Sequence, residues 1–244
     1  MKVCVVDTGL DVTHEDLRGL SVGGWKSDGN GHGTHVTGTI AAQQNDYGVI
    51  GVAPDASIYV ALACDKNGYC YASSIMNTVT QCVNAGADII SMSIGGTGWS
   101  TTERNFYDNV RRGGTMIIAA SGNSGSTAKN YPASYPSVMS VAAVDANEKV
   151  ASFSTRNNKV DIAAPGVRVA STYPGNRYVY MDGTSMATPH VSGVAALLKS
   201  YRPNATVDQI FNAMKNTARD KGAAGYDIYY GAGIVDAVAA LRAL

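Results

Sequence analysis

Short runs of β-branched and other apolar residues alternate along the chain with longer segments of helical spacing. This alternation restricts the fold most strongly. The runs predicted to be buried strands lie at 2–7, 57–63, 87–95, 115–121, 137–144 and 159–166. The helical segments between them lie at 32–45, 71–86 and 101–114. Strands that alternate with helices pair in parallel through right-handed crossovers. The sequence therefore predicts an α/β fold with a mostly parallel central sheet and helices on both faces.

Length and composition favour one globular domain over residues 1–244. Of these residues 45% are hydrophobic and 16% are charged, so the chain can bury a large core, and no repeat or linker divides it. Nineteen basic residues balance nineteen acidic ones without a run of like charge, which argues against nucleic acid or a membrane surface as a partner. No apolar stretch reaches the roughly 20 residues of a membrane span. The opening MKVCVVDTG is typical of a strand rather than of a signal peptide.

The cysteines allow one short-range disulfide. Cys64 and Cys70 flank the turn-like sequence DKNGY, so a bridge between them would close a small loop. Spacing does not fix connectivity, and two free thiols remain the alternative. The chain has no C-x-x-C pair, and its cysteines lie far in sequence from the histidines of HGTH, so we expect no cysteine-ligated metal.

Polar residues stand where strands end and helices begin. Asp7 ends the first predicted strand, and Asn123 follows a later one after a single glycine. His32 and Ser185 each stand at a glycine-flanked helix start. Taken singly, each residue has an ordinary alternative as a cap, a turn-closing group or a packing residue. In a parallel sheet these ends meet at one edge, and an acid, a base, an amide donor and a hydroxyl there suit nucleophilic acyl transfer.

Three rival chemistries fit the residues less well. His32 and His35 are three positions apart, whereas the zinc motif H-E-x-x-H needs four positions and a glutamate. Asp7-Thr8-Gly9 has the letters of an aspartic protease, but that mechanism needs a second such carboxylate, and Asp182-Gly183-Thr184 has the wrong order. An α/β-hydrolase needs G-x-S-x-G, whose last position is Ala187 here.

A set of motifs gives the chain a family resemblance. In chain order they are VVDTG, GHGTHVTGTIAA, SMSIGG, AASGN and GTSMATPHVSG. Together they resemble the subtilisin-like serine proteases, or subtilases, and the resemblance extends to YGAGIVDAVAAL near the carboxyl end. It implies a subtilisin-like three-layer fold, a single peptidase catalytic domain over 1–244, and a serine endopeptidase that forms an acyl-enzyme without a catalytic cofactor.

The resemblance gives each strand-end residue a role. Ser185 matches the nucleophile, and His32 matches the base that takes its proton and later protonates the leaving amine. Asp7 matches the acid that orients the imidazole and stabilises its cation. Asn123, with the backbone N–H of Ser185, matches the donors to the developing oxyanion.

Substrate binding follows from the same resemblance. Segments 68–70 and 93–95 would pair with an extended polypeptide by strand addition. The assigned residues, with Asn130 near the base of the pocket, are Gly68, Tyr69, Cys70, Ser93, Ile94, Gly95, Ala120, Ser121, Gly122 and Asn130. This uncharged lining implies broad specificity with an apolar or aromatic preference before the cut bond. The alternative is that the glycines serve only close packing.

The resemblance also implies a structural calcium ion and reveals two departures from the family. The matching calcium ligands are Asp16, Asn45 and the carbonyls of Gln43, Tyr47 and Val49. The family's N-terminal ligand is missing because Asp7 stands almost at the start. We therefore expect a chain that lacks the usual N-terminal segment and a weakened calcium site.

Some relatives bridge the first strand to the helix before SMSIGG with cysteines at other positions. Cys4 and Cys82 therefore form either a second disulfide or two buried thiols.

Relatives are usually secreted as zymogens, and disulfides would agree with an extracellular location. We therefore expect an extracellular monomer whose partners are polypeptide substrates, and possible further partners are its own propeptide or a protein inhibitor. The alternative is a catalytically impaired subtilase-fold protein that binds peptides, because the missing N-terminal segment prevents assembly of the active state.

Overall fold

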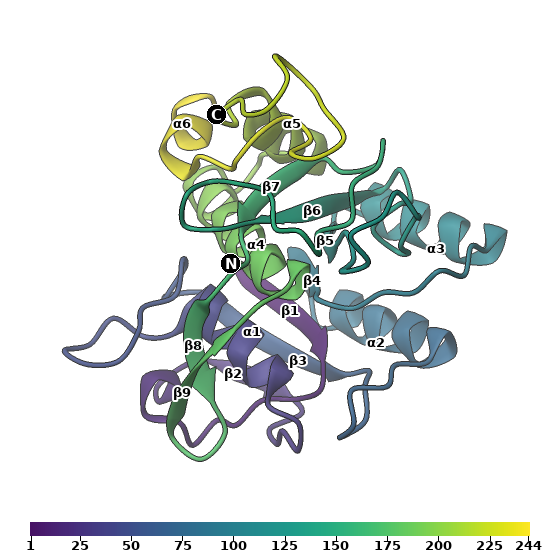
Figure 1. Ribbon diagram of the computed structural model, residues 1–244. Helices are drawn as coiled ribbons and strands as arrows, with labels where there is room; N and C mark the ends of the chain where they lie inside the picture. Colours follow the sequence, from purple (N-terminus) through teal and green to yellow (C-terminus); the bar gives the residue numbers. More distant parts are fainter.

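The computed structural model describes residues 1–244 and contains a seven-stranded sheet in which every neighbouring pair is parallel (Figure 1). The strand order is β2-β3-β1-β4-β5-β6-β7. The bounds are β1 (Lys2–Asp7), β2 (Val22–Gly24), β3 (Ser57–Leu62), β4 (Ile89–Met92), β5 (Met116–Ala120), β6 (Val138–Val144) and β7 (Ile162–Pro165). All the predicted strands are present, which confirms the α/β prediction. The sequence does not predict β2, because VGG is too short and glycine-rich to give a strand signal.

Helices cover both faces of the sheet (Figure 1). One face carries a group of mutually packed helices: α1 (His32–Ala41), α4 (Thr184–Tyr201), α5 (Val207–Asn216) and α6 (Ala237–Arg242). The other face carries α2 (Ala72–Asn84) and α3 (Thr101–Arg112). A single turn of 3₁₀ helix spans Glu15–Leu17. The structure is thus the predicted three-layer arrangement.

The alternation of side chains along β1 shows why both faces need a helical layer. Val3 and Val5 join the core beneath α1 and α4, whereas Cys4 and Val6 join the core beneath α2 and α3. All four side chains are fully buried. A strand that is apolar on both faces requires cover on both, as parallel sheets do.

A hairpin outside the main sheet packs against α1. It consists of the antiparallel strands β8 (Val169–Tyr173) and β9 (Arg177–Met181). The Nε2 atom of His35 lies 3.0 Å from the carbonyl oxygen of Val169 and 3.2 Å from that of Val179, so its N–H donates to both strands. This hairpin is absent from the sequence-based prediction, and it fixes the flank of the helix that begins at His32.

The structure contains two disulfides and no free cysteine. Cys4–Cys82 joins β1 to α2, and both residues are fully buried. Cys64–Cys70 closes the loop that follows β3. The predicted short-range pair is therefore present, and the open question of Cys4 and Cys82 is resolved as a bridge.

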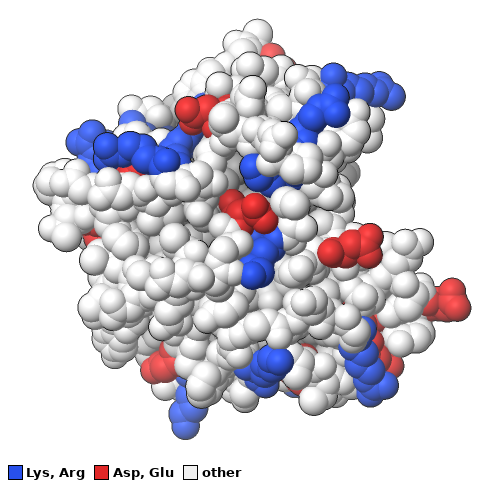
Figure 2. Space-filling model, turned by 180° about the vertical axis from the view of Figure 1, so that it is seen from behind, with Lys and Arg blue, Asp and Glu red and all other residues white.

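Charged side chains of both signs are interspersed over the face of the molecule seen in Figure 2. No patch of one sign dominates this face, in keeping with the balanced composition. None of the helices is long and apolar enough to cross a membrane.

Candidate active site

The carboxyl ends of the central strands and the starts of α1 and α4 meet at one cleft of about 480 Å³. Asp7 is the last residue of β1, Ser93 follows β4, and Gly122 and Asn123 follow β5. His32 is the first residue of α1 and also lines the cleft, as does Ser185 from the first turn of α4. The parallel topology thus brings together residues that are up to 178 positions apart, from Asp7 to Ser185.

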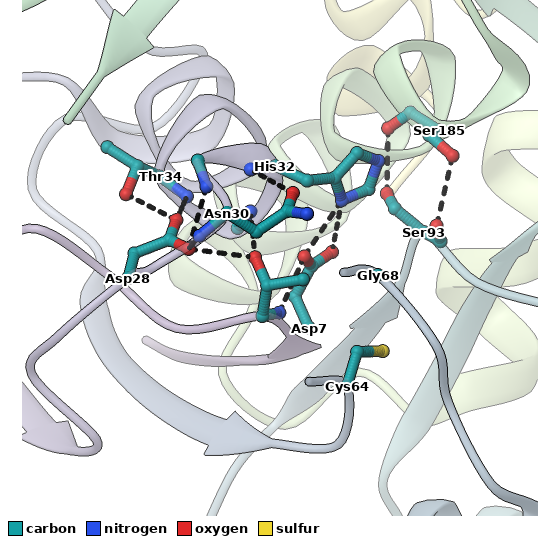
Figure 3. Close-up of polar contacts among 12 residues, drawn as sticks. Asp7, Asp28, Asn30, His32, Thr34, Cys64, Gly68, Ser93 and Ser185 are labelled. Carbon is teal, nitrogen blue, oxygen red and sulfur yellow. Dashed lines mark hydrogen bonds and ion pairs between the residues drawn. The ribbon is translucent and has the colours of Figure 1, made fainter. Parts of the chain in front are cut away.

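Asp7 and His32 are in direct polar contact in this cleft (Figure 3). The Nδ1 atom of His32 lies 2.8 Å from Oδ1 and 3.0 Å from Oδ2 of Asp7. The Asp7 side chain is fully buried, and the His32 side chain is 22% exposed. Burial lowers the pKa of His32, but the charge of Asp7 and its hydrogen bond outweigh this, so the pKa lies above its usual 6.5.

A second carboxylate, Asp28, organises the helix start. It accepts hydrogen bonds from the backbone N–H groups of Asn30, Gly31 and Thr34, and from the hydroxyls of Thr8 and Thr34 (Figure 3). Gly31, the residue before α1, has a φ of 104°, a conformation that residues with a side chain rarely adopt. As a glycine, it cannot cap the helix with a side chain of its own. Asp28 supplies that cap from three residues earlier. Asp28 is not among the predicted site residues, although an aspartate just before a helix start is a cap signal.

Ser185 is held by a reciprocal pair of hydrogen bonds with Ser93. The Ser185 hydroxyl donates to the Ser93 carbonyl oxygen at 2.9 Å, and the Ser93 hydroxyl donates to the Ser185 carbonyl oxygen at 2.7 Å (Figure 3). Gly183, with a φ of 154°, allows the sharp entry into α4. In the close-up, the second ring nitrogen of His32 faces Ser185. In this arrangement the Ser185 hydroxyl nevertheless directs its proton to the Ser93 carbonyl oxygen rather than to His32.

Asn123 has one end of its side-chain amide fixed and the other free. Its Oδ1 accepts from the N–H of Thr184 at 2.9 Å and from the Thr184 hydroxyl at 2.8 Å. The amide nitrogen Nδ2 is therefore the end that faces Gly183. A Cβ atom built at Gly183 would lie 3.5 Å from this nitrogen. Asn123 also lines the cleft. The arrangement leaves an N–H donor available beside Ser185.

The predicted substrate-binding residues lie in the cleft lining, with one exception. The residues that line it are Gly68, Tyr69, Cys70, Ser93, Ile94, Gly95, Ala120, Gly122 and Asn130. Ser121 does not line it, because its side chain is buried and donates to the Thr155 carbonyl oxygen at 3.4 Å. Ser121 follows the end of β5, and its hydrogen bond to Thr155 keeps the side chain in the interior, away from the cleft.

Asn130 fills part of the space between two walls of the cleft. Its Nδ2 donates to the Ala120 carbonyl oxygen at 3.0 Å. A methyl group at Gly95 would collide with this amide, and one at Gly122 would lie 3.2 Å from the Asn130 Cβ. These two glycines are therefore needed to accommodate the Asn130 side chain.

Among the predicted calcium ligands, Asp16 is a buried carboxylate that contacts the loop at 43–49. Asp16 is fully buried and forms no ion pair with a basic side chain. Its oxygens accept from Asn45 Nδ2 at 2.9 Å and from the Val49 N–H at 2.8 Å. A buried carboxylate without a cationic partner is costly, and oxygen donors are the ligands that calcium prefers. These residues fit a calcium ion only if the Asn45 amide turns its oxygen toward Asp16 and gives up the hydrogen bond that it accepts from the Tyr47 N–H.

Comparisons with known proteins agree with this site and fold. The sequence model of the Subtilase family matches residues 1–233. Subtilisin DY of Bacillus licheniformis is 42% identical over 254 residues, covering 99% of this chain and 91% of that protein. Subtilisin BL of Lederbergia lenta is 46% identical over 248 residues, covering 99% and 91%. The crystal structure of the psychrophilic subtilisin-like protease Apa1 from the Antarctic psychrotroph Pseudoalteromonas sp. AS-11 superposes with a TM-score of 0.94 at 28% identity, covering 98% of this chain and 92% of that one.

Proposed function

The chain belongs to the subtilase family of serine endopeptidases, and from this premise we propose that it cleaves polypeptides with Asp7, His32 and Ser185 as its catalytic residues. The observation that carries this proposal is the contact of Asp7 with Nδ1 of His32, 2.8 Å long, in a cleft that Ser185 also lines. Such a contact leaves Nε2 as the ring atom that can take a proton from a hydroxyl.

The first step is attack by Ser185. Its hydroxyl leaves the Ser93 carbonyl and turns to His32, whose Nε2 takes the proton while the serine oxygen bonds to the scissile carbonyl carbon. Asp7 stabilises the imidazolium that forms. His32 then protonates the leaving amine, and water releases the acyl group by the same steps in reverse order. Because His32 must be unprotonated, activity extends from neutral to alkaline pH.

The developing negative charge on the carbonyl oxygen needs donors. We assign this role to Asn123 Nδ2 and to the backbone N–H of Ser185 at the start of α4. The fixed Oδ1 of Asn123, held at 2.9 Å from the N–H of Thr184, supports this assignment because a preorganised donor needs no reorganisation during the reaction.

For the substrate, we propose an extended polypeptide that lies between segments 68–70 and 93–95. The uncharged walls favour an apolar or aromatic side chain before the cut bond. Asn130 limits the depth of this pocket because its side chain stands between Gly95 and Gly122. Specificity remains broad, since backbone pairing supplies most of the recognition.

A protein that binds peptides without cleaving them is the second candidate. The observation in its favour is the Ser185 hydroxyl, which donates to Ser93 rather than to His32. In this case the cleft would still hold an extended peptide, but the nucleophile would stay unactivated.

One experiment separates the two functions. The protein is treated with a fluorophosphonate probe while cleavage of an unfolded protein substrate is followed, with Ser185→Ala as the test variant and Ser200→Ala, an exposed serine of the same helix, as its control. We expect labelling and cleavage in the native protein and in Ser200→Ala, and neither in Ser185→Ala. A folded native protein that is not labelled and does not cleave would contradict the endopeptidase proposal.

We further propose a structural calcium ion held by Asp16, Asn45 and the carbonyls of Gln43, Tyr47 and Val49. Such an ion would neutralise the buried Asp16 charge and stiffen the loop, and the chemical steps above do not involve it.

The two disulfides support an extracellular location. There, a propeptide or a protein inhibitor that occupies the cleft as an extended strand would be a natural partner.

A further inference from the structure

The two disulfides lie in very different surroundings. Cys4 and Cys82 are both fully buried between the sheet and α2. Cys64 is 3% exposed, whereas its partner Cys70 is only half-buried, and both line the proposed catalytic cleft. Only the second bridge is therefore within reach of solutes and of a bound substrate.

The loop closed by Cys64–Cys70 has one anchored arm and one free arm. On the anchored arm, the N–H groups of Ala63 and Cys64 donate to the carbonyl oxygen of Asp7 at 3.0 and 3.3 Å. On the other arm, the hydrogen bonds of residues 68–71 all end within residues 65–75. The free arm is the one that carries the proposed substrate edge, 68–70. It therefore depends for its position on the loop and on its continuation into α2 at Ala72.

Two kinds of contact hold the loop together. The Asp65 carboxylate accepts from the N–H groups of Asn67 and Tyr69 at 2.9 and 3.0 Å, which folds the exposed tip. At the tip, the Asn30 side chain donates to the Lys66 carbonyl oxygen at 3.1 Å. The disulfide cross-links the two arms and ties Cys70 directly to Cys64, whose backbone N–H donates to the carbonyl oxygen of Asp7. Together with the backbone pairing of Cys64 and Cys70, the bridge therefore holds the substrate edge beside the strand end that carries Asp7.

We propose that Cys64–Cys70 positions one edge of the substrate cleft, and that its reduction by a small dithiol weakens binding of extended peptides while the acylation chemistry is retained. This inference rests on the endopeptidase function proposed above. Cys64 and Cys70 are positioning residues, because they touch neither the scissile bond nor the proton that His32 takes.

The chemical step is thiol–disulfide exchange. A thiolate of the dithiol attacks the accessible Sγ of Cys70, a mixed disulfide forms, and Cys64 leaves as a thiolate that takes up a proton. The second thiol of the reagent then attacks its own sulfur in the mixed disulfide and releases Cys70. In total, one protein disulfide becomes two thiols, and the dithiol becomes a cyclic disulfide. The buried Cys4–Cys82 bridge is shielded from this attack.

The test compares two substrates on the Cys64→Ser/Cys70→Ser double variant. For a tetrapeptide amide we expect KM to rise about 10-fold, because an unfixed edge must be ordered on binding. For a small acetyl ester, and for fluorophosphonate labelling, we expect rates within about 2-fold of the native protein, since neither probe needs the edge. The matched control is Cys4→Ala/Cys82→Ala, whose KM should stay unchanged.

Mild dithiothreitol treatment of the folded native protein provides an independent measurement that does not rely on the variant folding. We expect the same rise in KM, recovery after reoxidation, and a mass spectrum in which only the Cys64–Cys70 bridge is opened. An unchanged KM with this bridge open would overturn the inference. So would a loss of labelling as large as the loss of peptide cleavage. A native protein that never reacts with the probe would instead overturn the proposed function.

Discussion

The two histidines of helix α1 stand three positions apart and meet opposite surroundings. At the cleft end, His32 faces Asp7, and that carboxylate raises its pKa above 6.5. On the flank beneath β8 and β9, His35 is fully buried, and burial lowers its pKa to about 4. Its Nδ1 has no hydrogen-bond partner. The comparison teaches that a nearby carboxylate, rather than burial alone, decides which of the two histidines takes up a proton more readily.

Replacing the carboxylate at the cleft end should have the largest effect. In Asp7→Asn, the amide cannot stabilise the imidazolium or hold the same tautomer, so, if the proposed roles hold, we expect kcat to fall by about 10⁴-fold, the loss known for this change in a Ser-His-Asp triad. The raised pKa of His32 should also fall toward its usual value. Both are measured from the pH profile of peptide cleavage.

The control for this variant is Asp55→Asn, an exposed carboxylate outside the cleft. Its kcat should equal that of the native protein. A kcat for Asp7→Asn within 10-fold of the native value would remove Asp7 from the catalytic set and leave His32 without its distinguishing partner.

The flank of α1 should instead control stability in acid. The folded-state pKa of His35, about 4, lies below the unfolded value of 6.5, so the unfolded chain binds more protons between these pH values. Stability should therefore fall as pH drops from 6.5 to 4, by about 3 kcal/mol from this one group. Urea unfolding at pH 7 and at pH 4.5 measures the change.

The variant His35→Gln should lose most of this pH dependence, whereas His14→Gln should retain it. His32 acts with the opposite sign. Its raised pKa contributes stability that is fully present below pH 6.5 and is lost as pH rises through the folded-state pKa. If His35→Gln has the same acid sensitivity as the native protein, the flank histidine is not the group that destabilises the fold.

The main features of the fold were predictable because they depend on local patterns. Each predicted strand is a β-branched run, and parallel pairing follows from the helices between the runs. The hairpin of β8 and β9 was not predictable in this way. It is held by His35 and other groups of α1, which lie more than 130 residues earlier in the chain. Such contacts leave no periodic trace in the hairpin's own sequence.

The candidate site was predictable in its positions but not in its side-chain orientations. Strand ends placed Asp7 and Asn123 at one edge, and the structure has both there. Three details depend on packing between distant segments: the Ser185 hydroxyl bonds to Ser93, Ser121 points away from the cleft, and Asn130 stands between two glycines. Sequence spacing fixes which residues meet, whereas the surrounding atoms select the rotamer.

The smallest effect is expected at the other end of α1, where the loop at 43–49 meets the buried Asp16 carboxylate. If calcium binds there, a concentration ten times its Kd stabilises the fold by about 1.4 kcal/mol. In a chain of this size that corresponds to a rise in Tm of about 3–6 °C. Thermal unfolding with calcium and with a chelator measures the shift, and Asp16→Asn should abolish it because the charged ligand is lost.

Magnesium is the ion control, since its small octahedral shell suits this loop of carbonyls poorly. An equal Tm in calcium and in chelator would mean that the hydrogen bonds from Asn45 and Val49 satisfy Asp16 by themselves. The two ends of α1 would then differ in kind, with a carboxylate that supports a proton-carrying histidine at one end and a carboxylate that binds only protein N–H groups at the other.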